Sequence, residues 1–103
     1  MPRPLGITSL QILAATRGEA SYGLDIITRT ELPSGTVYPT LGRLKDAGLL
    51  KSAWEDQRQA DRAGRPRRRY YTLTAAGAAA LAAGTSRLRA AAGELGRLAE
   101  GRR

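Results

Sequence analysis

The residues best suited to chemistry are arginines gathered in one short segment. Residues 57–69 contain six arginines and a single acidic residue, Asp61. An arginine side chain ends in a planar guanidinium group, whose N–H donors match phosphate oxygens and the edge of guanine. Three of these arginines are predicted to contact nucleic-acid phosphates, namely Arg65, Arg67 and Arg68. A mobile, solvated run of charge is the alternative interpretation of the same segment.

A second candidate site lies between residues 35 and 47. Val37, Leu41 and Leu44 have the spacing of one buried helix face, so the polar residues between them are expected to point outward. A helix of about 13 residues is about 20 Å long, enough to cross a major groove about 12 Å wide. Contact with DNA is therefore predicted, and an ordinary solvated helix face is the alternative. The predicted contacts are Thr36, Tyr38, Thr40 and Arg43, with Tyr22 and Ser34 beside them.

The composition argues against several classes of function. A chain of 103 residues is long enough for one small domain. It has no cysteine and no histidine, so no metal site and no cofactor are predicted. The few acidic residues lack partners at a spacing that suits acid–base catalysis, and no enzyme is predicted. A formal net charge of +8 favours a polyanionic partner. Fifteen of the 17 cations are arginine, a bias that a GC-rich genome would also produce.

Three short helices are predicted in the first half of the chain. The spacing of apolar residues places them at residues 9–16, 22–31 and 35–47. Their predicted N-caps are Thr8, Ser21 and Ser34. In the second helix, Leu24 and Ile27 are expected to face the core.

The residues that follow have the pattern of strands. Residues 50–55 and 68–73 are rich in β-forming residues, which predicts a hairpin. Their connection, residues 56–67, is too long for a tight turn and is expected to be mobile. Trp54 and one tyrosine of the strands are expected to pack the sheet against the helices. The predicted fold class is therefore mainly α with a small β-hairpin, a winged helix-turn-helix.

A last helix is predicted over residues 75–100, with Thr74 as its N-cap. A head of three short helices can cover only the start of such a helix, so its leucines are expected to meet a second copy of the chain. The predicted dimer contacts are Leu81, Leu88, Leu95 and Leu98. The sequence thus predicts a DNA-binding domain at residues 1–74 and a dimerisation helix with its tail at residues 75–103.

Two strings of residues are more distinctive than generic helix-turn-helix spacing. They are Gly35-Thr36-Val37-Tyr38-Pro39-Thr40-Leu41-Gly42-Arg43-Leu44 and Gly64-Arg65-Pro66-Arg67-Arg68-Arg69-Tyr70-Tyr71-Thr72-Leu73-Thr74. With these strings, residues 7–81 resemble the PadR family of bacterial transcriptional regulators. The resemblance implies a homodimeric repressor that binds an inverted repeat, released in some members by phenolic or drug-like ligands. The single C-terminal helix is similar to that of the small subgroup, which dimerises through it.

The chain departs from small members of that family in two ways. Its last helix carries no aromatic residue, so a flat effector is not expected to stack there. If the protein has a small-molecule effector, it is expected between the C-terminal helices and the heads, near Trp54 or Tyr71. The tail is short, so the dimer contact is expected to be small or to be completed by Ile7 and Leu10.

The leading prediction is a dimeric repressor that binds double-stranded DNA. The alternative is a winged-helix module that binds RNA or an acidic protein partner. The longest uncharged apolar stretch is much shorter than the roughly 20 residues of a spanning helix, and no signal peptide is recognisable. A cytoplasmic protein is therefore expected, without contact with a membrane.

Overall fold

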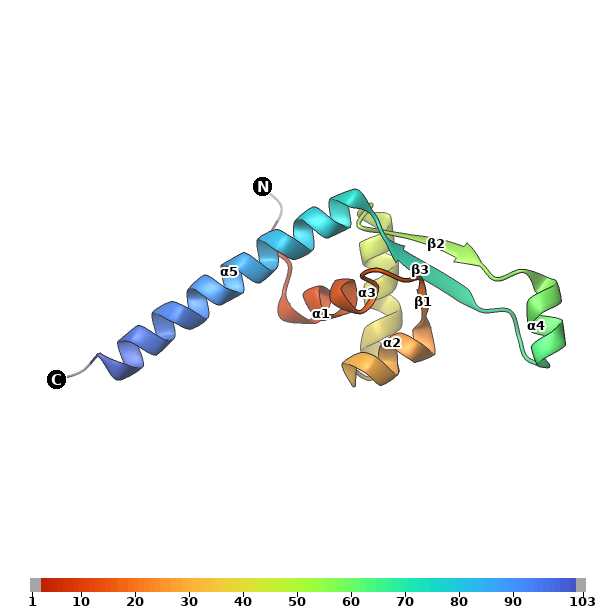
Figure 1. The fold of residues 1–103 in the computed structure, drawn as a ribbon, viewed down its shortest axis with the longest axis horizontal. Coiled ribbons are helices and arrows are strands. Elements are labelled where there is room, and N and C mark those ends of the chain that lie inside the picture. The colour runs from red at the N-terminus through yellow and green to blue at the C-terminus, as the bar shows by residue number, and fades with distance from the viewer. Residues whose placement is uncertain (1–2, 102–103) are drawn as a thin grey trace.

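The chain folds into a helical head, a sheet that projects from it and one long helix (Figure 1). A computed structural model describes residues 3–101. The elements are α1 (Ile7–Ala15), β1 (Ser21–Tyr22), α2 (Gly23–Thr30), α3 (Ser34–Asp46), β2 (Leu50–Trp54), α4 (Gln57–Ala63), β3 (Arg69–Leu73) and α5 (Ala75–Glu100). Helices α2 and α3 form the helix-turn-helix pair, and β2, α4 and β3 form the wing. The predicted winged helix-turn-helix is confirmed.

The core lies where α1, α2 and α3 meet the inner face of the sheet. Its fully buried aliphatic residues are Ile12, Leu13, Ile26, Val37 and Leu41. Tyr71 of β3 joins them and is 9% exposed. Burial of one such aliphatic side chain contributes about 1.5–3 kcal/mol. This packing fixes α3 on the head, with its polar face directed outward.

The sheet has three strands in the order β1-β3-β2, with both pairs antiparallel. Ser21 of β1 pairs with Tyr71, and Trp54 of β2 pairs with Arg69 at the far end of the hairpin. The sequence predicts the hairpin but not β1, because two residues carry no recognisable period. Since β1 leads directly into α2, it joins the wing to the helix pair.

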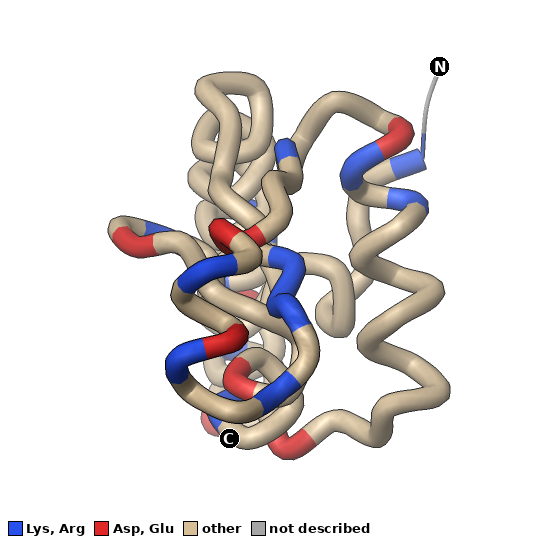
Figure 2. The backbone as a smooth tube through the Cα atoms, turned by 90° about the vertical axis from the view of Figure 1, so that its right-hand side faces the viewer, with Lys and Arg blue, Asp and Glu red and all other residues tan. Residues whose placement is uncertain are grey.

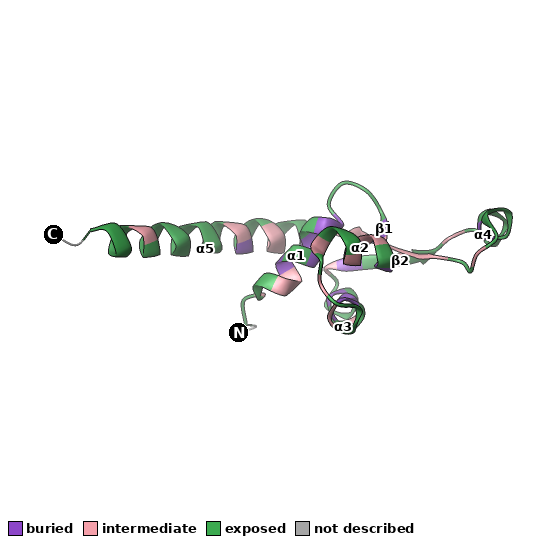
Figure 3. Ribbon diagram, turned by 90° about the horizontal axis from the view of Figure 1, so that it is seen from below, coloured by how far each residue is buried: buried purple, intermediate pink, exposed green. Residues whose placement is uncertain are grey.

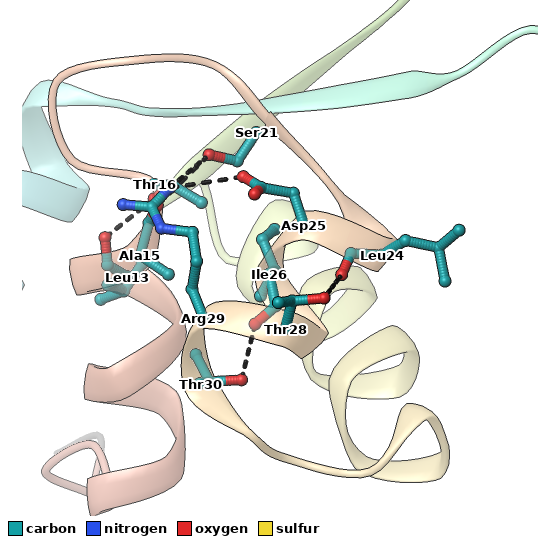
Figure 4. A network of polar contacts seen from close by, with 10 residues as sticks. All are labelled: Leu13, Ala15, Thr16, Ser21, Leu24, Asp25, Ile26, Thr28, Arg29 and Thr30. Atoms are coloured by element: carbon teal, nitrogen blue, oxygen red, sulfur yellow. Dashed lines mark hydrogen bonds and ion pairs between the residues drawn. The ribbon is translucent and has the colours of Figure 1, made fainter.

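Ser21 links α1 to the helix pair and does not cap α2 as predicted (Figure 4). Its hydroxyl donates to the carbonyl oxygen of Ala15 at 3.3 Å and accepts from Nη1 of Arg29 at 3.2 Å. Arg29 also pairs with Asp25, one turn earlier on α2, at 3.4 Å. These bonds connect the last turn of α1 to α2 and so help to set the angle between the two helices.

The other predicted caps have mixed outcomes. Thr74 is confirmed as the N-cap of α5, since its hydroxyl accepts the backbone N–H of Gly77 at 3.0 Å. Helices α1 and α3 begin earlier than predicted and without a side-chain cap. Thr8 and Ser34 therefore lie inside the first turns of these helices.

The buried face of α2 also differs from the predicted one. Ile26 is fully buried, Ile27 is half-buried and Leu24 is 64% exposed. Helical spacing alone allows either face of this short helix to be the apolar one. Leu24 is consequently available on the side of α2 that faces the wing.

The connection in the wing forms the short helix α4, so the predicted mobile loop is wrong. The side chain of Asp56 caps α4 by accepting the backbone N–H of Arg58 at 2.8 Å. Gly64 ends α4 with a φ of +68°, a conformation that favours glycine. Ala60 is fully buried. With one buried residue in seven, α4 has no apolar period that could predict it.

Helix α5 packs its first turns on the head and leaves its second half exposed (Figure 3). A Cβ atom on Gly84 would lie 2.5 Å from Cδ2 of Leu10, and one on Gly77 would lie 2.0 Å from the carbonyl oxygen of Leu49. Leu10 is therefore buried in its own chain, and the prediction that it completes a dimer contact is wrong.

Among the described helices, none is long and apolar enough to cross a membrane.

Gly77→Ala is expected to lower the free energy of unfolding by about 1–3 kcal/mol, because the new Cβ must push the Leu49 backbone away. Gly42→Ala is the matched control, since Gly42 lies inside α3 with open space around it. The control is expected to raise that free energy by about 0.5–1 kcal/mol. Urea denaturation at one protein concentration measures both, and equal effects would contradict the close approach.

Candidate nucleic-acid interface

A cleft of about 500 Å³ lies between the wing and the starts of α2 and α3. Three large side chains line it and remain exposed, Leu24 by 64%, Tyr38 by 48% and Trp54 by 54%. Arg67 and Arg69 line its wing side. Apolar surface beside guanidinium groups suits a partner with charged and uncharged parts, such as the phosphates, sugars and bases of a nucleic acid.

Of the outward residues of α3, Tyr38 lines this cleft. Ser34, Tyr38 and Arg43 are exposed and Thr36 is half-buried. Thr40 is 1% exposed, so the prediction that it points outward is wrong. It lies in line with the buried apolar residues one turn away, and its hydroxyl accepts a hydrogen bond from Nη2 of Arg43 at 2.9 Å. Thr40 therefore orients Arg43 from inside.

Tyr38 is held against the start of α2. A Cβ atom on Gly23 would lie 2.4 Å from Cε1 of Tyr38 and 2.6 Å from its hydroxyl oxygen. Only a residue without a side chain lets the ring lie this close. The two helices of the pair therefore touch through Tyr38, which also lines the cleft.

An ion pair closes the base of the wing tip. Nη1 and Nη2 of Arg65 donate to Oε1 and Oε2 of Glu55 at 2.6 and 2.9 Å, and the backbone N–H of Arg68 donates to Oε1 at 3.2 Å. Only 6% of the Glu55 side chain is exposed. The hydrogen bonds from Arg65 lower the pKa of Glu55 from 4.5 to about 2. The guanidinium of Arg65, a predicted phosphate contact, is thus engaged within the wing.

Arginines stack on aromatic rings on both faces of the wing. Cζ of Arg68 lies 3.9 Å from the ring centroid of Tyr22, which meets Tyr70 edge to face at 5.7 Å. Trp54 lies on the other face and is 54% exposed, so the prediction that it packs the sheet on the helices is wrong. Tyr71, 9% exposed, is the tyrosine that has this position.

Basic residues outnumber acidic ones at the wing end of the molecule (Figure 2). Residues 55–69 contain six arginines and three acidic residues, which leaves three net positive charges. Such a surface attracts polyanions, and the attraction is screened within about 10 Å at 0.1 M salt. Binding at this end is therefore expected to weaken as salt is added.

The sequence did not reveal three parts of this site. Leu24 is predicted to face the core, and Glu55 is not singled out among the acidic residues. Arg69 was not singled out, because its place opposite Trp54 follows only from the register of the hairpin. The sequence does hold one signal for this register. If Trp54 pairs with Arg69, then Glu55, which follows Trp54, lies close to Arg68, and opposite charges meet.

The expected place of an effector is also corrected. Trp54 and Tyr71 line the wing cleft and not the space beside α5. A separate cavity of about 550 Å³ lies between α1 and α5. Its lining among the described residues is small, aliphatic or basic, with Arg17 and Arg89 at its edge. Helix α5 and these two aromatic residues therefore line two different cavities and form no common site.

Comparison with known proteins identifies the family. The model of the transcriptional regulator PadR-like family matches residues 12–83. The chain belongs to this family. No curated protein matches the chain.

Solved structures share this fold, among them two PadR proteins. A regulator from Clostridium difficile R20291 has a TM-score of 0.80 at 23% identity, over 90% of this chain and 98% of its own. A Streptococcus mutans UA159 protein has a TM-score of 0.79 at 29% identity, over 100% of this chain and 97% of its own. Bacillus subtilis PadR, solved in complex with operator DNA, has a TM-score of 0.64 at 23% identity, over 74% of this chain and 46% of its own.

The membership sets the biochemical class. PadR-like proteins are transcriptional regulators, so the chain is a DNA-binding regulator and not an enzyme. The family predicted from the sequence is confirmed.

Glu55→Gln in this PadR-like chain is expected to loosen the wing tip, because a neutral amide loses the charge-assisted pair with Arg65. The readout is the protection of the Arg68 N–H against hydrogen exchange. The pKa of Glu55 is lowered on folding from 4.5 to about 2, so its stabilising effect is complete above pH 4.5 and is lost as the pH falls toward 2. Protection in the unmodified chain is expected to follow that window, and in Glu55→Gln to be low throughout.

Glu19→Gln is the matched control, because Glu19 is an exposed acid in the connection between α1 and β1. It is expected to leave the protection of Arg68 unchanged. Equal protection in Glu55→Gln and the unmodified chain would show that the ion pair does not order the wing.

Proposed function

We propose that the chain is a cytoplasmic, homodimeric repressor that binds an inverted-repeat operator in double-stranded DNA. Each subunit places α3 in a major groove and its wing against the neighbouring backbone. Occupation of the operator then blocks transcription. The observation that carries the proposal is the cleft, which Tyr38 of α3 and the arginines of the wing line together.

The two elements have different roles in this proposal. Ser34, Thr36, Tyr38 and Arg43 stand on a helix fixed by the core, so they can read base edges in a defined register. Arg67 and Arg68 stand on a flat hairpin and add charge toward the phosphates. Tyr22 contributes to phosphate binding by holding the guanidinium of Arg68 against its ring.

Dimerisation is proposed to occur through α5. Leu88, Leu95 and Leu98 are exposed by 36%, 67% and 64% on the half of the helix that leaves the head. Leu81 packs partly on the core of its own chain, so it contributes less. Residues 1–74 then serve as the DNA-binding part and residues 75–103 as the dimerisation helix with its tail, of which residues 102–103 lie outside the described part.

Arg43→Ala is expected to weaken binding to the operator by about 1–3 kcal/mol and binding to random DNA little, because Arg43 contacts base edges. Arg67→Ala is expected to weaken both DNAs about equally and to lower the salt slope by about one contact per subunit. Fluorescence anisotropy at several salt concentrations measures both, with an operator obtained by selection from random duplexes.

Arg97→Ala is the control for the loss of one charge, since Arg97 is exposed near the end of α5, away from the cleft. This variant is expected to weaken binding to operator and to random DNA only as much as the loss of one distant positive charge does. If Arg43→Ala weakens operator and random DNA equally, α3 does not read the sequence.

Leu88→Asp with Leu95→Asp is expected to abolish the dimer, because each leucine contributes about 1.5–3 kcal/mol when buried and a buried unpaired carboxylate is costly. Ala90→Asp is the matched control, because Ala90 is exposed on the opposite side of α5. It is expected to remain dimeric. Sedimentation equilibrium distinguishes the two, and a double variant that stays dimeric would place the interface elsewhere.

A small-molecule effector is proposed for the cavity between α1 and α5. Its basic residues, Arg17 and Arg89, favour an anion over a flat ligand that must stack on rings. Such a ligand changes DNA affinity only if it binds one spacing of the two heads better than another.

A further inference from the structure

Trp54 is an exposed aromatic residue with two arginines stacked against it. Cζ of Arg67 lies 4.8 Å from the ring centroid of Trp54, and Cζ of Arg69 lies 5.4 Å from it. The indole is 54% exposed and is not part of the core. Its cation–π partners are both arginines of the wing itself.

The strand register explains why these three side chains meet. Trp54 and Arg69 are directly paired across β2 and β3, so their side chains lie on the same face of the sheet. Arg67 precedes Arg69 by two residues and has the same orientation along an extended chain. All three residues line the cleft.

Stacking leaves the arginines able to bind a second partner. A guanidinium contacts a ring through its flat face, while its N–H donors lie at its edge. Arg69 uses only Nε, which donates to Ser52 Oγ at 3.1 Å. Within residues 3–101, Arg67 makes no ion pair or side-chain hydrogen bond. Both side chains line the cleft and keep N–H donors that have no partner among the described residues.

We propose that Trp54 is a positioning residue that makes the wing cleft a preformed binding site for the phosphodiester backbone of one DNA strand. This inference rests on the proposed function of DNA binding. The indole holds Arg67 and Arg69 apart and in place, so less side-chain entropy is lost when they meet phosphates. The apolar residues across the cleft, Leu24 and Tyr38, offer contact to the sugars.

The stack can be tested without DNA, because Trp54 is the only tryptophan. Arg67→Ala with Arg69→Ala is expected to shift the emission of Trp54 to the wavelength of a free exposed indole. Arg58→Ala with Arg62→Ala removes the same charge from α4 and is expected to leave the emission unchanged. Equal spectra for all three chains would show that the stack is not formed, whatever the protein binds.

The role in DNA binding is tested by a double-mutant cycle. Trp54→Leu is expected to weaken binding to operator and to random DNA about fivefold, and Trp54→Phe to restore most of the loss. In the background of Arg67→Ala with Arg69→Ala, Trp54→Leu is expected to have no further effect. Circular dichroism and sedimentation confirm that each variant is folded and has the assembly of the parent.

Three outcomes overturn the proposal. A fivefold loss that persists in the arginine-free background would mean that Trp54 contacts DNA directly. Failure of Trp54→Phe to restore binding would remove the ring as the cause. No loss from Trp54→Leu in a protein that still binds DNA would leave the proposed function intact and remove the positioning role. A parent chain that binds no DNA instead contradicts the proposed function.

Discussion

The carboxylate of Glu55 is the anion around which the arginine-rich wing is built. Six arginines within residues 55–69 repel one another, and an extended hairpin alone could not hold them in a defined arrangement. Glu55 receives two hydrogen bonds from Arg65 and one from the backbone of Arg68, which joins both ends of the segment that contains α4. The tip is thereby closed, and β3 begins with its side chains in a fixed register.

The remaining cationic side chains are organised by aromatic faces. Arg68 stacks on Tyr22 on one face of the wing, and Arg67 and Arg69 stack on Trp54 on the other. Because Tyr22 directly precedes α2, the order of the wing is transmitted to the helix pair. Close contact at Gly23 then places Tyr38 of α3 beside the same cleft. Helix α3, through Tyr38, and the wing thus line one cleft.

Elements long enough to show a regular spacing of apolar residues are predictable from the sequence. Very short elements, and contacts that depend on how two strands pair, are not. The apolar spacing gave α3, α5 and the hairpin, because these elements are long enough to show a period. Strand β1 has two residues and α4 has a single buried one, so neither leaves a periodic signal. Thr40 was misplaced because a threonine can lie in a core when its hydroxyl has a partner, here Arg43. The partners of Glu55 and Trp54 depend on strand register, which only the fold supplies.

We propose that α3 and the wing bind one continuous DNA site together. Hydroxyl-radical footprinting on a selected duplex tests this mode of binding most directly. Each half-site is expected to show backbone protection on both sides of one major groove and in the adjoining minor groove. Two such patterns are expected, related by a two-fold axis and about 34 Å apart, one helical turn. Protection that covers the duplex evenly, or equal affinity for single-stranded RNA, would contradict this mode of binding.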